Sequence, residues 1–480
     1  MTDLHWLSAT ELAGKIRAGE VKSEEVLDHL VARIEALDGP INSVVCRDLE
    51  RAREAARDAD QATARGGDLG PLHGVPMTIK DSWQTAGCTT TSGAPELADF
   101  VPDEDAAPVA RLRSAGAIPF AKTNLPIYAG DVQSYNEVYG TTNNPYDLGH
   151  TPGGSSGGSA AALAMGFTPI ELGSDIGGSI RVPAHYSGVT GHKSTFGIVP
   201  AHGQIPGPPG SLSQADLAVA GPMARTVDDL ELVLDVIAGP DRWSAPAWRL
   251  ELPPPRATDL GDLRIAAWLD DEGCPVDADT RRVLGAAATS LERAGARVDA
   301  EARPGFSLEK ASTVFLDLLF AALSGGHPRS KIEHMAGDTS ETPMGWVRRG
   351  TAARHRDWLG NHERRLQMRA MWERFFEDHD AILMPVHPRP AIRHDHSEPQ
   401  MDRTIDVDGT ERPYLDLFAW IAPAGLAYLP ATVVPVGMSE AGLPIGVQVV
   451  GPHLEDRTTL AVARAIEQVV GPIPRPARAV

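Results

Sequence analysis

The sequence predicts an α/β fold, in which a β-sheet is covered by helices on both faces. Short apolar segments that are typical of buried strands alternate along the chain with longer amphipathic segments that are typical of helices. The composition is that of an ordinary globular protein, with 42% hydrophobic and 22% charged residues in 480. The proline-rich segment 252–257 is followed by a further strand and helix of the same kind, so we expect one domain over residues 1–480.

Helices are predicted where a capping residue precedes an apolar stripe. Ser8 and Glu11 form a capping-box pattern that opens the first helix, and Ser23 is placed to cap the second. An alanine-rich helix is expected over 48–65, because Gly66 and Gly67 end it. Two further helices are expected over 226–237 and 279–295.

Strands are predicted at short apolar runs. Residues 76–79 read as a buried strand that carries Lys80 at its C-terminal end. Similar runs occupy 117–122, 167–172 and 263–268. The most apolar long window, 417–437, contains three prolines, so it predicts core strand and loop instead of a membrane span.

Charge and cysteine content narrow the class of protein. The formal net charge of −20 argues against nucleic acid or an anionic membrane as the main partner, because both bind basic surfaces. Cys46, Cys88 and Cys274 are too few and too unevenly spaced for a disulfide framework or a zinc motif. The N-terminus lacks a basic segment followed by an apolar core, so no signal peptide is expected. These features favour the cytoplasm.

Two Gly/Ser-rich loops carry the chemistry. They span 153–159 and 173–179, and they place Ser155 and Ser179 24 positions apart. Glycine lets the backbone approach a ligand closely, so that N–H groups can point at a developing negative charge. A serine in such a turn can be a nucleophile whose own loop forms the oxyanion hole. With Lys80 upstream, the pattern suggests an acyl-transfer hydrolase without a catalytic histidine.

These motifs resemble the amidase signature family of serine hydrolases. The shared patterns are Gly-Val-Pro before Lys80-Asp81, Lys122-Thr123-Asn124-Leu125-Pro126, Asn144-Pro145, the run 152–159 and the run 173–184. The segments 434–437 and 442–448 are similar to the closing strands of the family. The resemblance implies a large, twisted, mixed β-sheet with helices on both faces, an α/β/α sandwich.

The resemblance also implies a role for each site residue. Ser179 would attack the carbonyl, Ser155 would relay the proton, and neutral Lys80 would be the base. Backbone N–H groups would form the oxyanion hole at Ile176, Gly177, Gly178 and Ser179. The substrate would contact Ser155 and a loop comprising Ala129, Gly130, Asp131 and Val132. Supporting residues would be Ser156, Asp175 and Arg181, the last two as an ion pair.

Within the single domain, the resemblance suggests four regions. They are N-terminal helices over 1–70, a catalytic core over 71–242, a variable specificity region over 300–418, and closing strands with a C-terminal helix over 419–480. No cofactor and no metal are expected. His394 and His396 mimic a metal-ligand pair, but they lie in a polar, proline-rich loop, and His185 and His192 are interpreted as structural.

The aromatic residues of the variable region favour a hydrolase of neutral, aryl or apolar amides, with activity on esters and carbamates. On this hypothesis the chain acts on a small molecule as a monomer or homodimer, without nucleic acid or membrane. Two alternatives remain open. The chain is the amidase subunit of a tRNA-dependent amidotransferase that acts on glutamine, or it is an inactive binding protein on the same fold.

Overall fold

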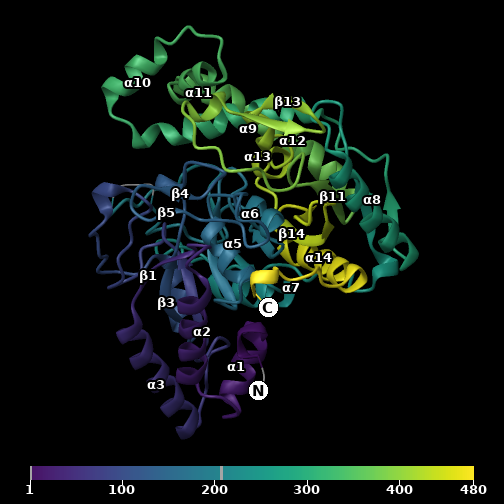
Figure 1. Cartoon of the computed structure of the whole chain (residues 1–480). Helices are drawn as coiled ribbons and strands as arrows, with labels where there is room; N and C mark the ends of the chain where they lie inside the picture. Colours follow the sequence, from purple (N-terminus) through teal and green to yellow (C-terminus); the bar gives the residue numbers. More distant parts are fainter. Residues whose placement is uncertain (1–2, 206–208, 480) are drawn as a thin grey trace.

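A computed structural model describes residues 3–205 and 209–479 of the chain (Figure 1). Its centre is an 11-stranded sheet with the strand order β1-β3-β2-β6-β8-β7-β14-β15-β11-β9-β10. These strands are β1 (Val44–Arg47), β2 (Pro76–Lys80), β3 (Ile118–Thr123), β6 (Ile170–Asp175), β7 (Thr190–Lys193), β8 (Val219–Ala224), β9 (Arg264–Ala267), β10 (Arg297–Asp299), β11 (Ala381–Pro385), β14 (Ala431–Met438) and β15 (Pro444–Val450).

The sheet is mixed, as expected. Strand β2 lies parallel to both β3 and β6, and β9 lies parallel to both β10 and β11. The strands between these two parallel groups are antiparallel to their neighbours, and so is the edge strand β1. Two small hairpins lie outside the sheet, β4 (Tyr135–Asn136) with β5 (Gly140–Thr141), and β12 (Thr404–Val407) with β13 (Thr410–Pro413).

Helices cover both faces of the sheet. They are α1 (Ala9–Arg17), α2 (Ser23–Leu37), α3 (Leu49–Arg65), α4 (Ala107–Ser114), α5 (Gly157–Ala164), α6 (Arg181–Ser187), α7 (Val227–Ile237), α8 (Ala278–Arg293), α9 (Leu308–Leu323), α10 (Arg329–Ala336), α11 (Pro343–Thr351), α12 (His355–Asp378), α13 (Ala422–Leu426) and α14 (Asp456–Val470).

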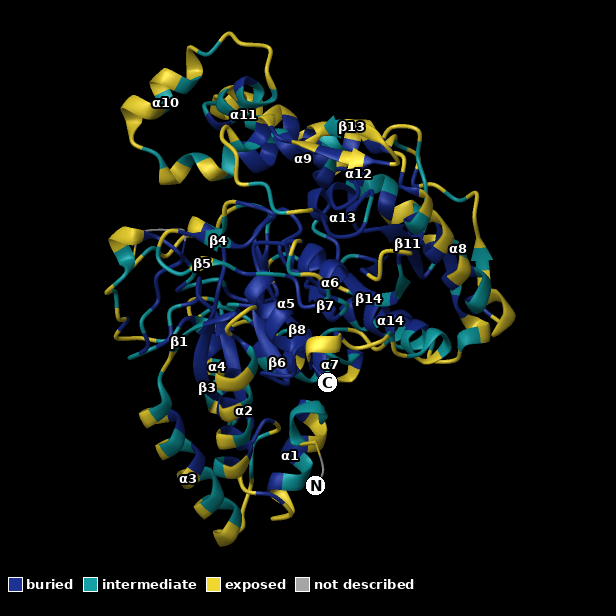
Figure 2. Ribbon diagram, in the orientation of Figure 1, coloured by how far each residue is buried: buried dark blue, intermediate teal, exposed yellow. Residues whose placement is uncertain are grey.

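The alternation of side chains in β14 shows how the two faces are divided. Val434 belongs to a core shared with α7, α8 and α14, whereas Val433 belongs to a core shared with α6, α9 and α13. Successive side chains of a strand point to opposite faces, so one strand serves both cores. Figure 2 shows the resulting buried centre, with exposed residues on the outer helices.

Most predicted elements are present within a few residues of their expected bounds. Ser8 caps α1 with the complete capping box, and Thr226 caps α7. The prediction for Ser23 was wrong, because Lys22 occupies the cap position of α2. The Ser23 hydroxyl instead donates a hydrogen bond to the Gly74 carbonyl, at 2.6 Å. The Ser23 hydroxyl thus contacts a residue 51 positions away and does not cap its own helix.

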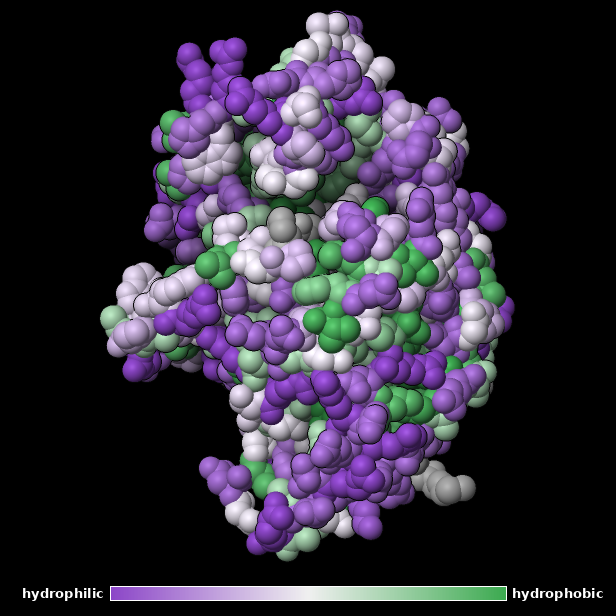
Figure 3. Space-filling view, turned by 90° about the vertical axis from the view of Figure 1, so that its left-hand side faces the viewer, coloured by the Kyte–Doolittle hydropathy of each residue, from purple (hydrophilic) through white to green (hydrophobic). Residues whose placement is uncertain are grey.

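The predicted specificity region, 300–418, is mainly helical in its first part. Helices α9 to α12 fill residues 308–378, and α10 and α11 project from the body at the top of Figure 1. The face shown in Figure 3 is hollowed beneath this projecting part, and hydrophobic side chains gather in the hollow. No helix in the described part of the chain is both long and apolar enough to cross a membrane.

Candidate functional site

The candidate site lies at the C-terminal ends of two neighbouring parallel strands. Ile79 of β2 is paired with Leu172 of β6, so Lys80 and Ser174, near the C-terminal ends of their strands, lie at the same edge of the sheet. In α/β sheets, ligands bind at the carboxyl ends of parallel strands, where the following loops converge. The two Gly/Ser-rich loops meet Lys80 at this edge.

The Lys80 side chain is fully buried and is held by two hydroxyl groups. Its Nζ donates hydrogen bonds to Ser155 Oγ at 2.7 Å and to Ser174 Oγ at 2.9 Å. No carboxylate accepts a hydrogen bond or forms an ion pair with this amine in the part of the chain that the structure describes. The amine is therefore held without a direct counter-charge.

Burial lowers the pKa of Lys80 from 10.5 to about 7, because the ammonium form loses its hydration. The charges of Asp175 and Glu171 oppose this effect without reversing it. A lysine with a pKa near neutrality is available as a base at ordinary pH.

Ser155 lies in a tightly packed loop before α5. The peptide bond between Gly154 and Ser155 is cis. A Cβ on Gly154 would lie 2.6 Å from the Asp131 carbonyl oxygen, and a Cβ on Gly158 would lie 2.4 Å from the Asn124 nitrogen. These glycines are needed for close backbone packing, which excludes the interpretation of this run as a flexible linker.

The loop that carries Ser179 is braced by the predicted ion pair. Arg181 Nη2 lies 3.0 Å from Asp175 Oδ1, and both side chains are fully buried. Although burial alone would raise the pKa of Asp175, the adjacent Arg181 guanidinium lowers it to about 2. Asp175 also accepts hydrogen bonds from the N–H groups of Gly178, at 3.0 Å, and Ile180, at 3.2 Å.

The contact of Gly178 limits the expected oxyanion hole. Its N–H group is already paired with Asp175, and so it is not free to hold an oxyanion. No hydrogen bond from the N–H groups of Ile176, Gly177 or Ser179 is found in the described structure. Those three N–H groups are the remaining candidates for the oxyanion hole.

Ser155 and Ser179 are brought together through the backbone. The Ser156 N–H donates to the Ser179 carbonyl at 3.1 Å, which holds the two loops side by side. The Ser156 hydroxyl lies 3.4 Å from the Ser174 carbonyl. Within the described residues, no hydrogen bond joins the side chains of Ser155 and Ser179. Ser179 is buried, with 6% of its surface exposed.

The expected substrate-binding loop lies against the loop that carries Ser155, but the charge of its Asp131 is already neutralised. Asp131 is buried and forms an ion pair of 2.7 Å with Arg403 Nη1. Tyr414 OH donates a second hydrogen bond to Asp131, at 2.7 Å. Ala129 and Gly130 are the more accessible residues of this loop, whereas Val132 is buried.

Several aromatic residues in and near the predicted specificity region pack against one another. Trp372 packs between Phe306 and Phe376, and Trp420 packs against Trp268. These contacts belong to the hydrophobic core. Phe418 differs, because its ring lies 3.2 Å from the position that a Cβ on Gly177 would occupy. Its neighbour there is Leu319 of α9, at 3.7 Å from the same point.

Three of the four histidines noted in the sequence, all but His394, have contacts that are typical of structural residues. His185 contacts the Gly446 and Arg389 carbonyls, and His192 is paired with buried Asp456 at 3.0 Å. His396 stacks on Tyr135 with ring centroids 3.7 Å apart. No group of three potential metal ligands, His394 included, is found among residues 3–205 and 209–479.

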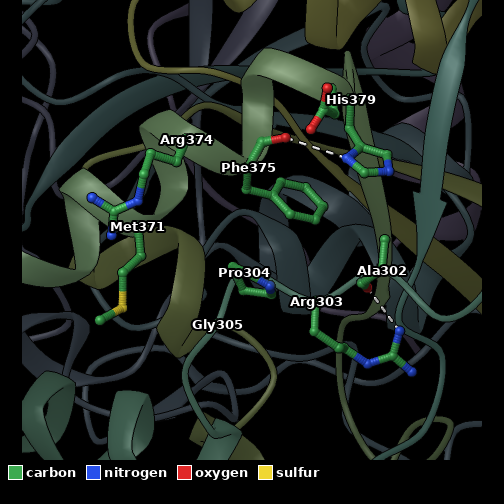
Figure 4. Close-up of a pocket in the computed structure, with 9 residues that line it drawn as sticks. Ala302, Arg303, Pro304, Gly305, Met371, Arg374, Phe375 and His379 are labelled. Carbon is green, nitrogen blue, oxygen red and sulfur yellow. Dashed lines mark hydrogen bonds between the residues drawn. The ribbon is translucent and has the colours of Figure 1, made fainter.

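A surface cavity of about 430 Å³ lies near β10, the last strand in the strand order (Figure 4). It is lined by residues that follow β10 and by the C-terminal part of α12, including Arg303, Arg374, Phe375 and His379. Six positions in the strand order separate β6 from β9, so this cavity does not belong to the site around Lys80.

Several side chains at the site were missed by the sequence analysis. Ser174 is the second acceptor of Lys80, and it lies inside a motif that we had already identified. Glu171 is fully buried, and its Oε1 accepts a hydrogen bond from Thr123 Oγ1 at 2.8 Å. A glutamate inside an apolar strand run was an available signal. Arg403 and Tyr414 gave no local signal, because they lie more than 270 positions from Asp131.

Comparisons with known proteins agree at the level of the family. The sequence model of the Amidase family matches residues 25–460. The chain is 34% identical to a glutamyl-tRNA(Gln) amidotransferase subunit of Salinispora tropica, over 99% of this chain and 100% of that protein. It superposes on a bacterial aryl acylamidase with a TM-score of 0.81 and 25% identity, over 97% and 96% of the two chains. It also superposes on the corresponding amidotransferase subunit from Thermotoga maritima, with a TM-score of 0.79 and 25% identity, over 99% of this chain and 98% of that chain.

These relatives overturn two expectations. The chain was expected to hydrolyse neutral aryl or apolar amides by itself, yet curated relatives that match it from end to end are amidotransferase subunits. The expectation of a monomer or homodimer without other partners is wrong for the same reason. Aromatic content misled us because most of those rings fill the core. Net charge misled us because it averages over the whole surface, and in an assembly another chain can contact the nucleic acid.

Proposed function

We propose that this chain, which belongs to the amidase family, is the amidase subunit of an amidotransferase and hydrolyses the side-chain amide of glutamine. The chain is a hydrolase of carbon–nitrogen bonds at the level that its family supports. The observation that carries the finer proposal is the 34% identity to a subunit of glutamyl-tRNA(Gln) amidotransferase over nearly the whole of both chains.

The proposed reaction begins at Ser179. Its hydroxyl oxygen attacks the amide carbonyl, and the proton passes through the Ser155 hydroxyl to neutral Lys80. Lys80 is already hydrogen bonded to Ser155 at 2.7 Å. This proton path also requires a hydrogen bond between the hydroxyl groups of Ser155 and Ser179. Catalytic hydrogen bonds often tighten only when substrate is bound, so we assign its formation to the enzyme–substrate complex.

The negative charge on the tetrahedral intermediate would be held by the N–H groups of Ile176, Gly177 and Ser179. Collapse of the intermediate breaks the C–N bond, and ammonia leaves with the proton returned from Lys80 through Ser155. Water then attacks the acyl-enzyme by the same relay, which releases glutamate and restores the Ser179 hydroxyl. Asp175 and Arg181 support this loop by holding its backbone in place. Their charges neutralise each other in the ion pair, so we assign neither of them a direct role in the reaction.

We also propose that residues 300–418 influence substrate choice. Leu319 at the C-terminal part of α9 and Phe418 at the end of this region both lie against Gly177. Ala129 and Gly130 are proposed as the accessible part of the substrate loop. A cytoplasmic location remains part of this proposal.

The test is purification of the tagged full-length chain from its own organism. We expect partner subunits to co-purify, and the assembly to release equal amounts of ammonia and glutamate from glutamine. The Ser179→Ala chain is the control, since it should assemble equally well and release neither product.

A chain that co-purifies with no partner and ignores glutamine, yet hydrolyses an anilide or a carbamate, would show the proposal to be wrong. Anilides and carbamates present a similar carbonyl carbon to Ser179. They therefore test whether the catalytic residues are competent when glutamine is not the substrate.

A further inference from the structure

Two of the three cysteines come together in the fold, although 42 positions separate them in the sequence. Cys46 lies on the edge strand β1, and Cys88 lies in the loop that follows β2. Their Sγ atoms are 4.0 Å apart, within hydrogen-bond distance for sulfur. Both are free thiols, Cys46 half-buried and Cys88 buried. Cys274 lies elsewhere, buried against Arg412 and Trp420.

We propose that Cys46 and Cys88 form a thiol oxidation site, at which an organic or inorganic hydroperoxide converts the two thiols into a disulfide. A disulfide requires an S–S distance of about 2.05 Å, so the sulfurs must approach by roughly 2 Å, which is within the reach of side-chain rotation. This inference is independent of the proposed function, because neither thiol takes part in amide hydrolysis.

The surroundings make Cys46 the attacking sulfur. The contact with the Cys88 thiol, which can donate to a Cys46 thiolate, lowers the pKa of Cys46 to about 7, although burial and the charge of Asp81 oppose this. The buried Lys122, paired with Cys46 across β1 and β3, also favours the thiolate. Burial and the same contact raise the pKa of the Cys88 thiol, which makes it the resolving partner.

The chemistry balances in two steps. The Cys46 thiol gives its proton to solvent, and the thiolate attacks the terminal oxygen of the hydroperoxide to form a sulfenic acid. The O–O bond breaks and expels an alkoxide, or hydroxide when the oxidant is hydrogen peroxide, which takes the proton back from solvent. Cys88 sulfur then attacks Cys46 sulfur. The S–S bond forms, the S–O bond breaks, and the Cys88 proton leaves with the hydroxide as water. Two thiols and one hydroperoxide thus yield one disulfide, one alcohol and one water.

The location gives the disulfide a structural consequence. Cys88 belongs to the loop that starts at Asp81, directly after Lys80, and the Asp81 carboxylate accepts hydrogen bonds from Thr91 within this loop. Lys122 Nζ anchors the same loop through Thr85 Oγ1, at 2.9 Å. Oxidation would therefore tie the edge strand of the sheet to the segment that leads away from Lys80.

The experiment exposes the reduced full-length protein to hydrogen peroxide or cumene hydroperoxide, blocks the remaining thiols with iodoacetamide, and measures intact and peptide masses. We expect the loss of two hydrogens, a cross-linked peptide pair that contains Cys46 and Cys88, and reversal by dithiothreitol. Cys274 should stay reduced during the exposure, because burial raises the pKa of its thiol to about 12, and it should be alkylated once urea unfolds the protein before the iodoacetamide step. Cys46 should react at least about tenfold faster than Cys274, given its thiolate character.

Three single substitutions separate the roles. Cys274→Ser is the matched control and should form the disulfide as the unsubstituted protein does. Cys88→Ser should stop at a Cys46 sulfenic acid that dimedone traps, and Cys46→Ser should show neither product. If a variant fails to fold, the rate of disulfide formation in the unsubstituted protein remains decisive, and it should rise through about pH 7. Alkylation of both thiols after exposure to excess peroxide, or equal reactivity of Cys274, would overturn the proposal.

Discussion

Arg403 and Asp131 form a buried ion pair of 2.7 Å that joins two segments 272 positions apart. The pair fastens the loop beside Gly154 to the segment that precedes β12. Tyr414 completes the arrangement by donating to the other oxygen of Asp131. The charge of Asp131 is thus used inside the protein and is not available to a substrate.

We predict that Arg403→Gln destabilises the protein by about 3–5 kcal/mol, because it leaves the Asp131 carboxylate buried without its counter-charge. Tyr414→Phe removes one hydrogen bond and should cost about 1–3 kcal/mol. The free energy of unfolding in urea measures both effects.

The control for this prediction is Arg329→Gln. Arg329 also pairs with a carboxylate, that of Glu333, but its side chain is 93% exposed. Its loss should cost less than about 1 kcal/mol, because surface ion pairs contribute little. Equal losses at Arg403 and Arg329 would contradict the role assigned to the buried pair.

For the proposed reaction, Ser179→Ala should abolish turnover, since no acyl-enzyme can form. Ser155→Ala and Lys80→Ala should each lower kcat by several orders of magnitude, and a double variant should be little worse than either single one. Ammonia release under saturating glutamine measures all of these. Ser174→Ala is the informative control, since Lys80 keeps its contact with Ser155 and the loss should be about tenfold. Substantial turnover by Ser179→Ala would remove Ser179 from the mechanism.

The pH dependence of activity should have one basic limb. The pKa of Lys80 is lowered to about 7, so the amine is protonated and inactive below that pH and neutral above it. Accordingly, kcat/KM should rise about tenfold per pH unit below pH 7 and level off above it. Lys80→Arg should be inactive across the range, since a guanidinium does not deprotonate in proteins. A rate that is highest at pH 5 and falls toward pH 8 would contradict a lysine base.

Glu171→Gln should change how stability depends on pH. Burial raises the pKa of Glu171 from 4.5 to about 7, so the folded protein keeps a proton that the unfolded chain loses between these values. The stabilising contribution of Glu171 is therefore full below pH 4.5 and is lost as pH rises through 7. The glutamine side chain of the variant does not bind or release such a proton. Relative to the unsubstituted protein, the variant should gain stability over this interval by up to roughly 3 kcal/mol.

The measurement is the difference in unfolding free energy between the two proteins at pH 4.5, 6 and 8. Glu25→Gln, on the exposed side of α2, is the matched control, because it makes the same substitution at the surface. A difference for Glu171→Gln that does not change with pH would contradict the raised pKa of this carboxyl group.

Much of the fold was predictable from local sequence. The capping box at Ser8, the glycine stop after α3 and the apolar run before Lys80 each act within a few residues of the element that they define. The ion pair between Asp175 and Arg181 was predictable for the same reason, since six positions separate the partners. Strand order was not predictable in this way. The order depends on the long connections between strands, which place β8 and β7 between β6 and β14.

The sequence by itself determined the family resemblance, the α/β class and the residues of the two Gly/Ser-rich loops. The tertiary structure decided which distant groups those loops meet. It placed Ser174 as a second acceptor for Lys80, buried the charge of Asp131 against Arg403, packed most of the aromatic residues into the core, and brought Cys46 beside Cys88. The physical reason is that hydrogen bonds, ion pairs and van der Waals contacts act over a few ångströms in space. Close-packed interiors bring together residues that the sequence separates by hundreds of positions.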